Sequence, residues 1–475
     1  MKTKISHNFL TALILLLVTT FSASAQLQKA IDDFAAHPTF KEATYGVCVM
    51  DINSGMILGS INEDMLMIPA STMKTVTCAT ALKVLGADFR FKTKVYHDGN
   101  INSKGVLNGN IIIVGGGDPS LESEYIDNNP SFIQACVDAI IENGITEIKG
   151  DIITDKSHYA TPATSPYWLT EDLAYYYGAG SFGINYADNS FKLQVRFSGE
   201  KAQIVGTVPE TIPGLKFDNR VKITTKGHDS FQLTLGEGSS TMRLLGNVKR
   251  RKGTLVYPCA NPNPDLLLRH DLINALTENK IKVANSDYKR GDKPTLIFEH
   301  KSVELPIILK SLLIRSDNMY AESVIKTIAH SADMLATSEN GGNFTKDFWQ
   351  FNGIDSTAFY MYDGSGLSKD DLITPRALAS ILKSMKTSYT FEYPSLFPLA
   401  GVEGTVKSLL AKTDYSGLFA VKSGSMRGVQ SFAGYYPVHN PRYVVVVIVN
   451  NYRGSRKVLY QNIADLLENS FSNLY

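Results

Sequence analysis

The stretch Pro69-Ala70-Ser71-Thr72-Met73-Lys74-Thr75 opens a segment that predicts a helix over residues 72–85, with Gly86 as its stop. One stripe of such a helix carries Ser71, Lys74, Cys78, Leu82 and Leu85. Because the last three are apolar, the stripe is expected to face the interior. Burial lowers the pKa of a lysine, and a neutral lysine beside a hydroxyl is a base beside a nucleophile. The alternative is a helix-capping serine with a lysine that reaches solvent.

Two further motifs decide between these interpretations, Ser316-Asp317-Asn318 and Lys422-Ser423-Gly424. Taken singly, the first suits a helix cap and the second a solvated strand end. Each motif, however, has the context that a catalytic role needs: a helix start, a loop between helices, and a strand that ends on glycine. S-x-x-K, S-D-N and K-T-G in this order are the signature of class A β-lactamases and penicillin-binding proteins.

The residue types fit acyl transfer through a covalent intermediate. Ser71 is the candidate nucleophile at a helix N-terminus, which favours developing negative charge. Lys74 is the expected base for acylation. Ser316 supplies a hydroxyl that relays a proton to the leaving amine, and Lys422 biases that relay electrostatically. Asn318 offers its amide to the substrate and to Lys74.

The third motif supplies the expected substrate contacts. Lys422 with Ser423 can hold a substrate carboxylate. Gly424 lets an extended peptide lie against the strand edge. The backbone N–H groups of Ser71 and Ser425 are expected to form the oxyanion hole.

The order of elements predicts an α+β fold with a large insertion. An N-terminal hairpin over residues 44–61 and a C-terminal meander over residues 418–449 can form one antiparallel sheet of five strands, with helices from both chain ends covering one face. Between them, residues 92–285 alternate short strands with Gly, Asn and Asp turns, interrupted by one helix over residues 131–142. The expected catalytic domain therefore comprises residues 26–91 and 286–475, with 92–285 as a β-rich insertion.

Residues 1–25 have the pattern of a cleavable secretory signal peptide. Lys2 and Lys4 precede an apolar core over residues 9–21, and Ala23-Ser24-Ala25 fits a cleavage site. The apolar run is short for a membrane span, and no cysteine follows the cleavage site, so no stable membrane anchor is expected. The sequence thus predicts an exported protein.

Composition excludes several classes of function. The net charge is +1 over 475 residues, which leaves no footprint for nucleic acid. No motif indicates a metal or another cofactor. The four cysteines lack C-x-x-C spacing. Cys48 and Cys78 are expected to be buried small hydrophobes, although a bridge between them stays open.

Nearly the whole mature chain resembles the D-alanyl-D-alanine carboxypeptidase/endopeptidase family of low-molecular-mass class C penicillin-binding proteins, peptidase family S13. Besides the three motifs, the resemblance is carried by Gly116-Gly117-Asp118-Pro119-Ser120-Leu121, residues 168–185 with Tyr177-Gly178-Ala179, Asp363-Gly364-Ser365-Gly366-Leu367-Ser368, Gly401-Val402-Glu403-Gly404-Thr405 and Gly434-Tyr435. The large insertion after the S-x-x-K helix is typical of that family.

The resemblance implies a penicillin-binding transpeptidase/β-lactamase-like fold and a periplasmic location. It also implies cleavage of peptidoglycan stem peptides and cross-links, with β-lactam antibiotics as covalent inhibitors. Asp155 matches an insert segment that contacts the diaminopimelate side chain. Two departures are Ser423, where the family usually has threonine, and Asp371, where it often has asparagine.

Two alternatives to a D,D-peptidase remain open at this point. One is a serine β-lactamase or esterase on the same fold, against which the insertion and the missing class A deacylation signature argue. The other is an inactive wall-binding homologue, against which the complete motif set argues. An α/β-hydrolase does not fit, because no G-x-S-x-G occurs in the chain.

Overall fold

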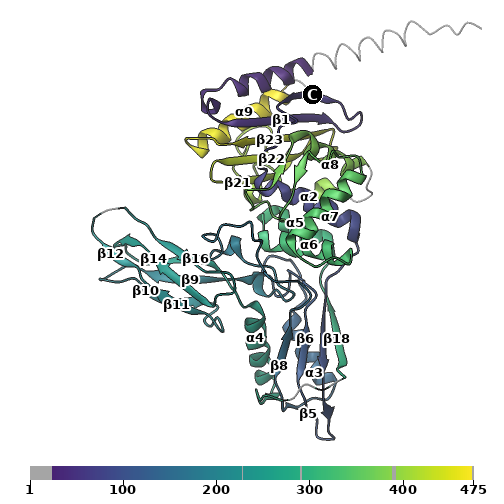
Figure 1. Cartoon of the computed structure of the whole chain (residues 1–475), viewed down its shortest axis with the longest axis vertical. Helices are drawn as coiled ribbons and strands as arrows, with labels where there is room; N and C mark the ends of the chain where they lie inside the picture. Colours follow the sequence, from purple (N-terminus) through teal and green to yellow (C-terminus); the bar gives the residue numbers. More distant parts are fainter. Residues whose placement is uncertain (1–23, 227, 289–290, 292, 388–391, 473–475) are drawn as a thin grey trace, which may run out of the picture.

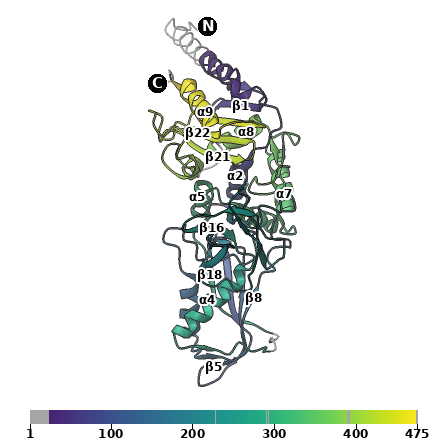
Figure 2. The same cartoon turned by 90° about the vertical axis from the view of Figure 1, so that its left-hand side faces the viewer.

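The computed structural model describes residues 24–226, 228–288, 291, 293–387 and 392–472. Most of the predicted signal peptide lies outside these residues. Figure 1 shows an elongated molecule with a sheet-and-helix part at one end, a lobe below it and a second lobe to the side. Figure 2, turned by 90°, shows the first part stacked directly on the lower lobe.

An antiparallel sheet of five strands joins the two ends of the chain, as the sequence predicted. In spatial order the strands are β2 (Ile57–Ile61), β1 (Thr44–Asp51), β23 (Tyr443–Asn450), β22 (Val429–Tyr436) and β21 (Ala420–Met426). β1 and β23 pair from Thr44↔Asn450 to Asp51↔Tyr443. β22 and β23 are buried throughout, which fits the nearly continuous apolar sequence of β23. β21 is an edge strand.

Helices cover both faces of this sheet, because alternate residues of a strand point to opposite sides. Val47 and Val49 face a cluster with the helix over residues 24–35 and with α9 (Arg456–Phe471). Cys48 and Met50 face the other cluster, which contains α2 and its neighbours. The chain-end helices thus share one face, as expected.

The remaining elements of this part pack on the two faces of the sheet. They are η1 (Pro38–Phe40), η2 (Ala70–Thr72), α2 (Met73–Leu85), α5 (Leu305–Arg315), α6 (Asn318–Ser331), α7 (Ser338–Phe351), β19 (Phe359–Tyr360), β20 (Leu372–Ile373), α8 (Pro375–Thr387), η5 (Tyr393–Leu396) and η6 (Gly404–Val406). α2 is buried from Met73 to Leu82 on every side, so it is a central helix and not the one-sided amphipathic helix that the stripe predicted.

α7 was not predicted from the sequence, and its glycines explain why. Gly341 and Gly342 favour a turn by local propensity. A Cβ at Gly341 would lie 2.2 Å from the Ile325 carbonyl oxygen, and one at Gly342 would lie 2.1 Å from the Met361 carbonyl oxygen. Close packing against α6 and the chain directly after β19 therefore requires glycine inside this helix.

The lower lobe contains two four-stranded sheets and two helices. Their strands are β18 (Thr295–Lys301), β3 (Lys92–His97), β6 (Ile111–Val114) and β8 (Ile152–Asp155) in one sheet, and β17 (Lys282–Val283), β7 (Glu147–Ile148), β5 (Val106–Asn108) and β4 (Asn100–Ile101) in the other. The helices are α3 (Phe132–Glu142) and α4 (Pro264–Glu278), of which the sequence predicted only the first. β18 pairs with β3, so the boundary expected at residue 286 cuts across this lobe.

The side lobe is built from short strands around its own apolar cluster. The strands are β9 (Ser190–Arg196), β10 (Gln203–Val208), β11 (Lys216–Asn219), β12 (Lys222–Thr224), β13 (Gln232–Thr234), β14 (Thr241–Leu245), β15 (Asn247–Lys249) and β16 (Thr254–Ala260). The turns η3 (Tyr176–Gly178) and η4 (Ala187–Asn189) precede it. The β-rich insertion expected from the sequence is therefore present, with α3 and α4 as its helices.

Candidate active site

Ser71 lies in the short turn η2, which leads directly into α2. Strand β21 packs closely against this turn. A Cβ at Gly424 would lie 2.5 Å from the Pro69 carbonyl oxygen and 2.9 Å from the Ser71 amide nitrogen. Only glycine lets the strand come so close. Ser71 itself is partly exposed, so its hydroxyl is accessible at the start of a buried helix.

Lys74 is fully buried one turn after Ser71. Its Nζ donates to Ser71 Oγ at 3.0 Å, to Asn318 Oδ1 at 2.6 Å and to the Ser365 carbonyl oxygen at 2.6 Å. Burial lowers the pKa of Lys74 to about 8, although the nearby Asp363 and Glu322 carboxyl groups oppose this shift. About half of the Lys74 side chains are therefore neutral near pH 8, with the nitrogen beside the Ser71 hydroxyl.

Of the second motif, Asp317 caps a helix, whereas Ser316 and Asn318 contact the buried lysines. Asp317 caps α6, since its Oδ1 accepts from the Tyr320 N–H at 3.0 Å. Ser316 ends α5 in the left-handed region with φ of 61°, which turns its side chain out of both helices. Asn318 donates from Nδ2 to the Tyr177 carbonyl oxygen at 2.7 Å, while its Oδ1 accepts from Lys74. The helix-cap interpretation is thus correct for Asp317.

The third motif joins the same cluster through Lys422. Lys422 is fully buried, not a solvated strand end, and its Nζ donates to Ser316 Oγ at 2.9 Å. Burial, reinforced by Lys74, holds the pKa of Lys422 well below its ordinary value. Ser423 Oγ lies 2.7 Å from Thr405 Oγ1. Lys74 therefore links the first motif to the second, and Ser316 links the second to the third.

Ser425 and Asp155 complete the residues that the sequence singled out. Ser425 lies opposite Gln430 in the β21–β22 ladder, and its side chain is exposed beside the edge of the sheet. Asp155 ends β8 in the lower lobe, where its carboxylate accepts from the Ser157 N–H at 3.0 Å. Asp155 thus lies on a different group of elements from the motif cluster, by which we mean Ser71, Lys74, Ser316, Asn318 and Lys422 with their hydrogen-bond partners.

Three contacts of the cluster were not assigned from the sequence: the carbonyl oxygens of Ser365 and Tyr177 and the hydroxyl of Thr405. All three lie in stretches that carry the family resemblance. Two of them act through backbone oxygens, which leave no signature in the residue type. Only Thr405, as a hydroxyl residue in Gly401-Val402-Glu403-Gly404-Thr405, offered a signal.

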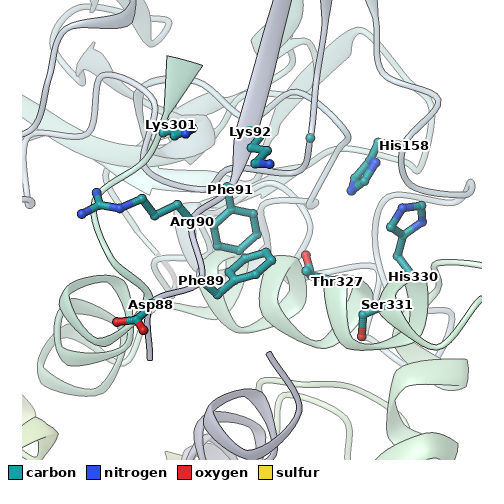
Figure 3. Close-up of a pocket in the computed structure, with 11 residues that line it drawn as sticks. Asp88, Phe89, Arg90, Phe91, Lys92, His158, Lys301, Thr327, His330 and Ser331 are labelled. Carbon is teal, nitrogen blue, oxygen red and sulfur yellow. The ribbon is translucent and has the colours of Figure 1, made fainter. Parts of the chain in front are cut away.

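A cavity of about 480 Å³ lies near the C-terminal end of α6 and contains no motif residue. Figure 3 shows the rings of Phe89 and Phe91 next to each other, with Thr327 and Ser331 on the helix below. The rings of His158 and His330 lie 4.2 Å apart, and burial together with His330 lowers the pKa of His158 to about 4. This cavity is separate from the cluster around Ser71.

Metal ligands, membrane-spanning helices and disulfides in the described residues bear on the class of site. No group of three or more His, Cys, Asp or Glu side chains is arranged to hold a metal ion in this part of the chain. None of the helices in the same residues is both long and apolar enough to cross a membrane. All four cysteines are free and buried, so Cys48 and Cys78 do not form the bridge that the sequence left open.

The model of the D-Ala-D-Ala carboxypeptidase 3 (S13) family matches residues 27–469. The D-alanyl-D-alanine carboxypeptidase of Actinomadura sp. (strain R39) is 25% identical over 92% of this chain and 83% of its own length. The D-alanyl-D-alanine carboxypeptidase DacB of Haemophilus influenzae is 26% identical over 86% of this chain and 85% of its own.

The fold has a close counterpart among solved structures. The crystal structure of penicillin binding protein 4 (dacB) from Haemophilus influenzae superposes with a TM-score of 0.79 over 94% of this chain and 99% of that chain, at 24% identity. A second structure of that protein, complexed with a novel β-lactam, has a TM-score of 0.73 at 23% identity. At these identities the match establishes the α+β fold.

Proposed function

Because this chain belongs to the D-Ala-D-Ala carboxypeptidase 3 (S13) family, we propose that it hydrolyses D-Ala-D-Ala ends of peptidoglycan stem peptides through an acyl-enzyme on Ser71. One observation carries this proposal. Lys74 Nζ lies 3.0 Å from Ser71 Oγ, and burial lowers the pKa of this lysine to about 8. A partly exposed hydroxyl thus has a poised base within hydrogen-bonding distance.

Acylation begins when neutral Lys74 accepts the proton of Ser71 and the serine oxygen attacks the scissile carbonyl carbon. Negative charge develops on the carbonyl oxygen, where the backbone N–H groups of Ser71 and Ser425 donate to it. Asn318 and the Ser365 carbonyl oxygen keep Lys74 in position through their contacts with Nζ. Preorganisation of the base therefore comes from two elements, α6 and the loop after β19.

Collapse of the tetrahedral intermediate expels the terminal D-alanine as an amine. Ser316 relays to that amine the proton that Lys74 took from Ser71, and Lys422, whose Nζ lies 2.9 Å from Ser316 Oγ, biases the relay. Lys422 and Ser423 hold the carboxylate next to the scissile bond. The substrate backbone lies along β21, the edge strand of the sheet, and can pair with it as an added strand. Water then hydrolyses the ester on Ser71.

The same site accommodates related ligands. β-Lactam antibiotics, with a strained amide beside a carboxylate, acylate the same serine. Cross-links that end in a free carboxylate next to a D-alanyl bond are a second substrate, which makes the enzyme an endopeptidase as well. Asp155 of β8 contacts the side chain of the stem peptide in this proposal.

Location and domain roles follow from the sequence pattern. The signal sequence of residues 1–25 exports the chain to the periplasm, where finished wall and water meet. Because β18 pairs with β3, the insertion extends to the end of β18: residues 26–91 and 302–475 form the catalytic domain, and residues 92–301 form an insertion that contributes the Tyr177 contact to Asn318.

The test uses mature protein and labelled penicillin. Tryptic mapping should place the adduct on the peptide of residues 42–74, and Ser71→Ala should not be labelled. An adduct elsewhere would refute the mechanism. Rapid release of penicilloate would favour the β-lactamase alternative, because a D,D-peptidase holds its penicilloyl ester for a long time.

A second assay addresses the substrate. Defined pentapeptide and cross-linked muropeptides are incubated with the enzyme, and products are identified by mass spectrometry. Release of D-alanine supports the carboxypeptidase, and cleavage of the cross-link supports the endopeptidase. If neither product forms, the hydrolase proposal fails.

A further inference from the structure

Two aspartates behind the motif cluster are completely buried and lie side by side. Asp363 and Asp371 both have no exposed surface. Their side chains are within hydrogen-bonding reach of each other. Two adjacent carboxylates in a dry interior repel strongly unless one of them carries a proton.

The hydrogen bonds around the pair identify which aspartate is ionised. Asp363 accepts four N–H donors: its Oδ1 accepts from Ser365 and Gly366, and its Oδ2 from Ser368 and from the Trp168 indole. Four donors stabilise the charged form of a carboxylate. Asp371 accepts one donor, the Tyr362 N–H at 2.7 Å, and its Oδ2 has no donor among the described residues.

We propose that Asp371 is protonated in the native enzyme, donates a hydrogen bond to Asp363, and thereby positions the loop that holds Lys74. The proton satisfies the pair, because Asp363 gains a fifth donor and Asp371 loses its buried charge. Asp371 is a positioning residue, since it reaches the reacting atoms only through Asp363. As far as it concerns catalysis, the inference rests on the proposed function.

The path from Asp371 to the base is short. Asp363 fixes the backbone N–H of Ser365 at 2.9 Å, and the carbonyl oxygen of Ser365 accepts from Lys74 at 2.6 Å. The loop is also fixed to α2 by Thr77, whose hydroxyl donates to the Gly364 carbonyl oxygen at 2.6 Å. Release of Asp363 would therefore move the acceptor that holds Lys74.

Other charged groups surround the pair. Glu322 on α6 accepts from the Gly364 N–H at 3.0 Å, and burial followed by the charge of Asp363 raises the pKa of Glu322 to about 7. Lys326 on α6 and Lys74 on α2 are the neighbouring bases. For Asp371, burial and then the charge of Asp363 raise the pKa well above its ordinary value.

The sign of the pH dependence follows from proton linkage. An unfolded aspartate releases its proton near pH 4, whereas folded Asp371 retains it to a much higher pH. Above about pH 4 the native state thus binds more protons than the unfolded state, and wild type loses stability as pH rises toward the folded pKa. Asparagine has the same shape, accepts from Tyr362 and donates to Asp363 without taking up a proton.

The first test compares the melting temperatures of wild type and Asp371→Asn between pH 4 and pH 8. The melting temperature of the variant should rise relative to wild type by about 3 °C per pH unit. Asp370→Asn, an exposed neighbour, is the matched control and should show a flat difference. A difference for Asp371→Asn that does not change with pH would overturn the proposal.

The second test measures the rate at which labelled penicillin acylates the enzyme at pH 7. Asp371→Asn should stay near the wild-type rate, while Asp371→Leu, which lacks the donor, should lose on the order of tenfold or more. Equal rates for both variants would refute the positioning role. If wild type is not acylated at all, the proposed function fails, but the melting experiment still decides the state of the acid pair.

Discussion

The ammonium nitrogen of Lys422 lies 2.9 Å from the hydroxyl oxygen of Ser316, although 106 positions separate the two residues. This contact connects an edge strand of the sheet to the junction between α5 and α6. Because Asn318 of that junction also contacts Lys74, two buried lysines reach the site from opposite sides. The two lysines have different expected effects on the reaction.

Substitution of each lysine should distinguish the base for acylation, Lys74, from the residue that binds the substrate carboxylate, Lys422. Lys74→Ala should chiefly lower kcat for release of D-alanine from a pentapeptide, by about 10²–10⁴-fold, because it removes the base. Lys422→Ala should raise KM and also slow acylation, because it removes both the carboxylate partner and the charge beside Ser316. The exposed Lys407→Ala is a control. Near-normal kcat in Lys74→Ala would exclude this lysine as the base.

The pH profile should follow the titration of Lys74. Burial lowers its pKa to about 8, and a base acts only when neutral, so kcat/KM should rise with pH up to about 8. Below that pH the rate should fall about tenfold per unit. Stopped-flow acylation by penicillin between pH 5 and pH 9 measures this rising limb of the pH–rate profile. Persistence of the same limb in the residual activity of Lys74→Ala would assign it to another group.

Ser423 offers a test of carboxylate recognition. Its hydroxyl lies 2.7 Å from that of Thr405, so it is held in one orientation beside Lys422. Ser423→Ala should raise KM about tenfold for a peptide with a free C-terminal carboxylate and should hardly affect the matching C-terminal amide. Ser423→Thr keeps the hydroxyl and should behave as wild type. Equal effects on both peptides would argue against a carboxylate contact.

The cysteines should be unreactive in the native protein. All four are free and buried, and burial raises the pKa of Cys48 and of Cys259 to about 12. A thiol reagent should therefore modify none of them until the protein is denatured, when four equivalents should react. Fewer than four after denaturation without reductant would reveal a disulfide.

The sequence was informative where chemistry depends on side chains at fixed spacing. Ser71 with Lys74 is a helical pair, and the turn-separated strands at both chain ends predicted the sheet. It was uninformative where tertiary contacts override local propensity. Gly341 and Gly342 suit a turn, yet the close approach of Ile325 and Met361 puts them inside α7.

The degree of burial of individual side chains also could not be predicted from the local sequence pattern. The stripe on α2 suggested one inward face, but α5, α6 and α8 surround that helix, so Lys74 lies in a dry interior. The contact between Asp363 and Asp371 likewise arises from tertiary packing. Eight positions separate the two residues, and no local rule predicts that their side chains meet.

The pairing of β1 with β23 has a consequence for the order in which the parts of the chain fold. Thr44 and Asn450 are partners across more than four hundred residues, so closing the sheet requires nearly the entire polypeptide. The apolar clusters of the two lobes draw only on residues between 95 and 298, so they can consolidate earlier. We therefore expect an incomplete chain to carry Ser71 and Lys74 without a working site, because Lys422 arrives on a strand that emerges almost last. Hydrolytic activity is in this way absent until nearly the whole chain is available for folding.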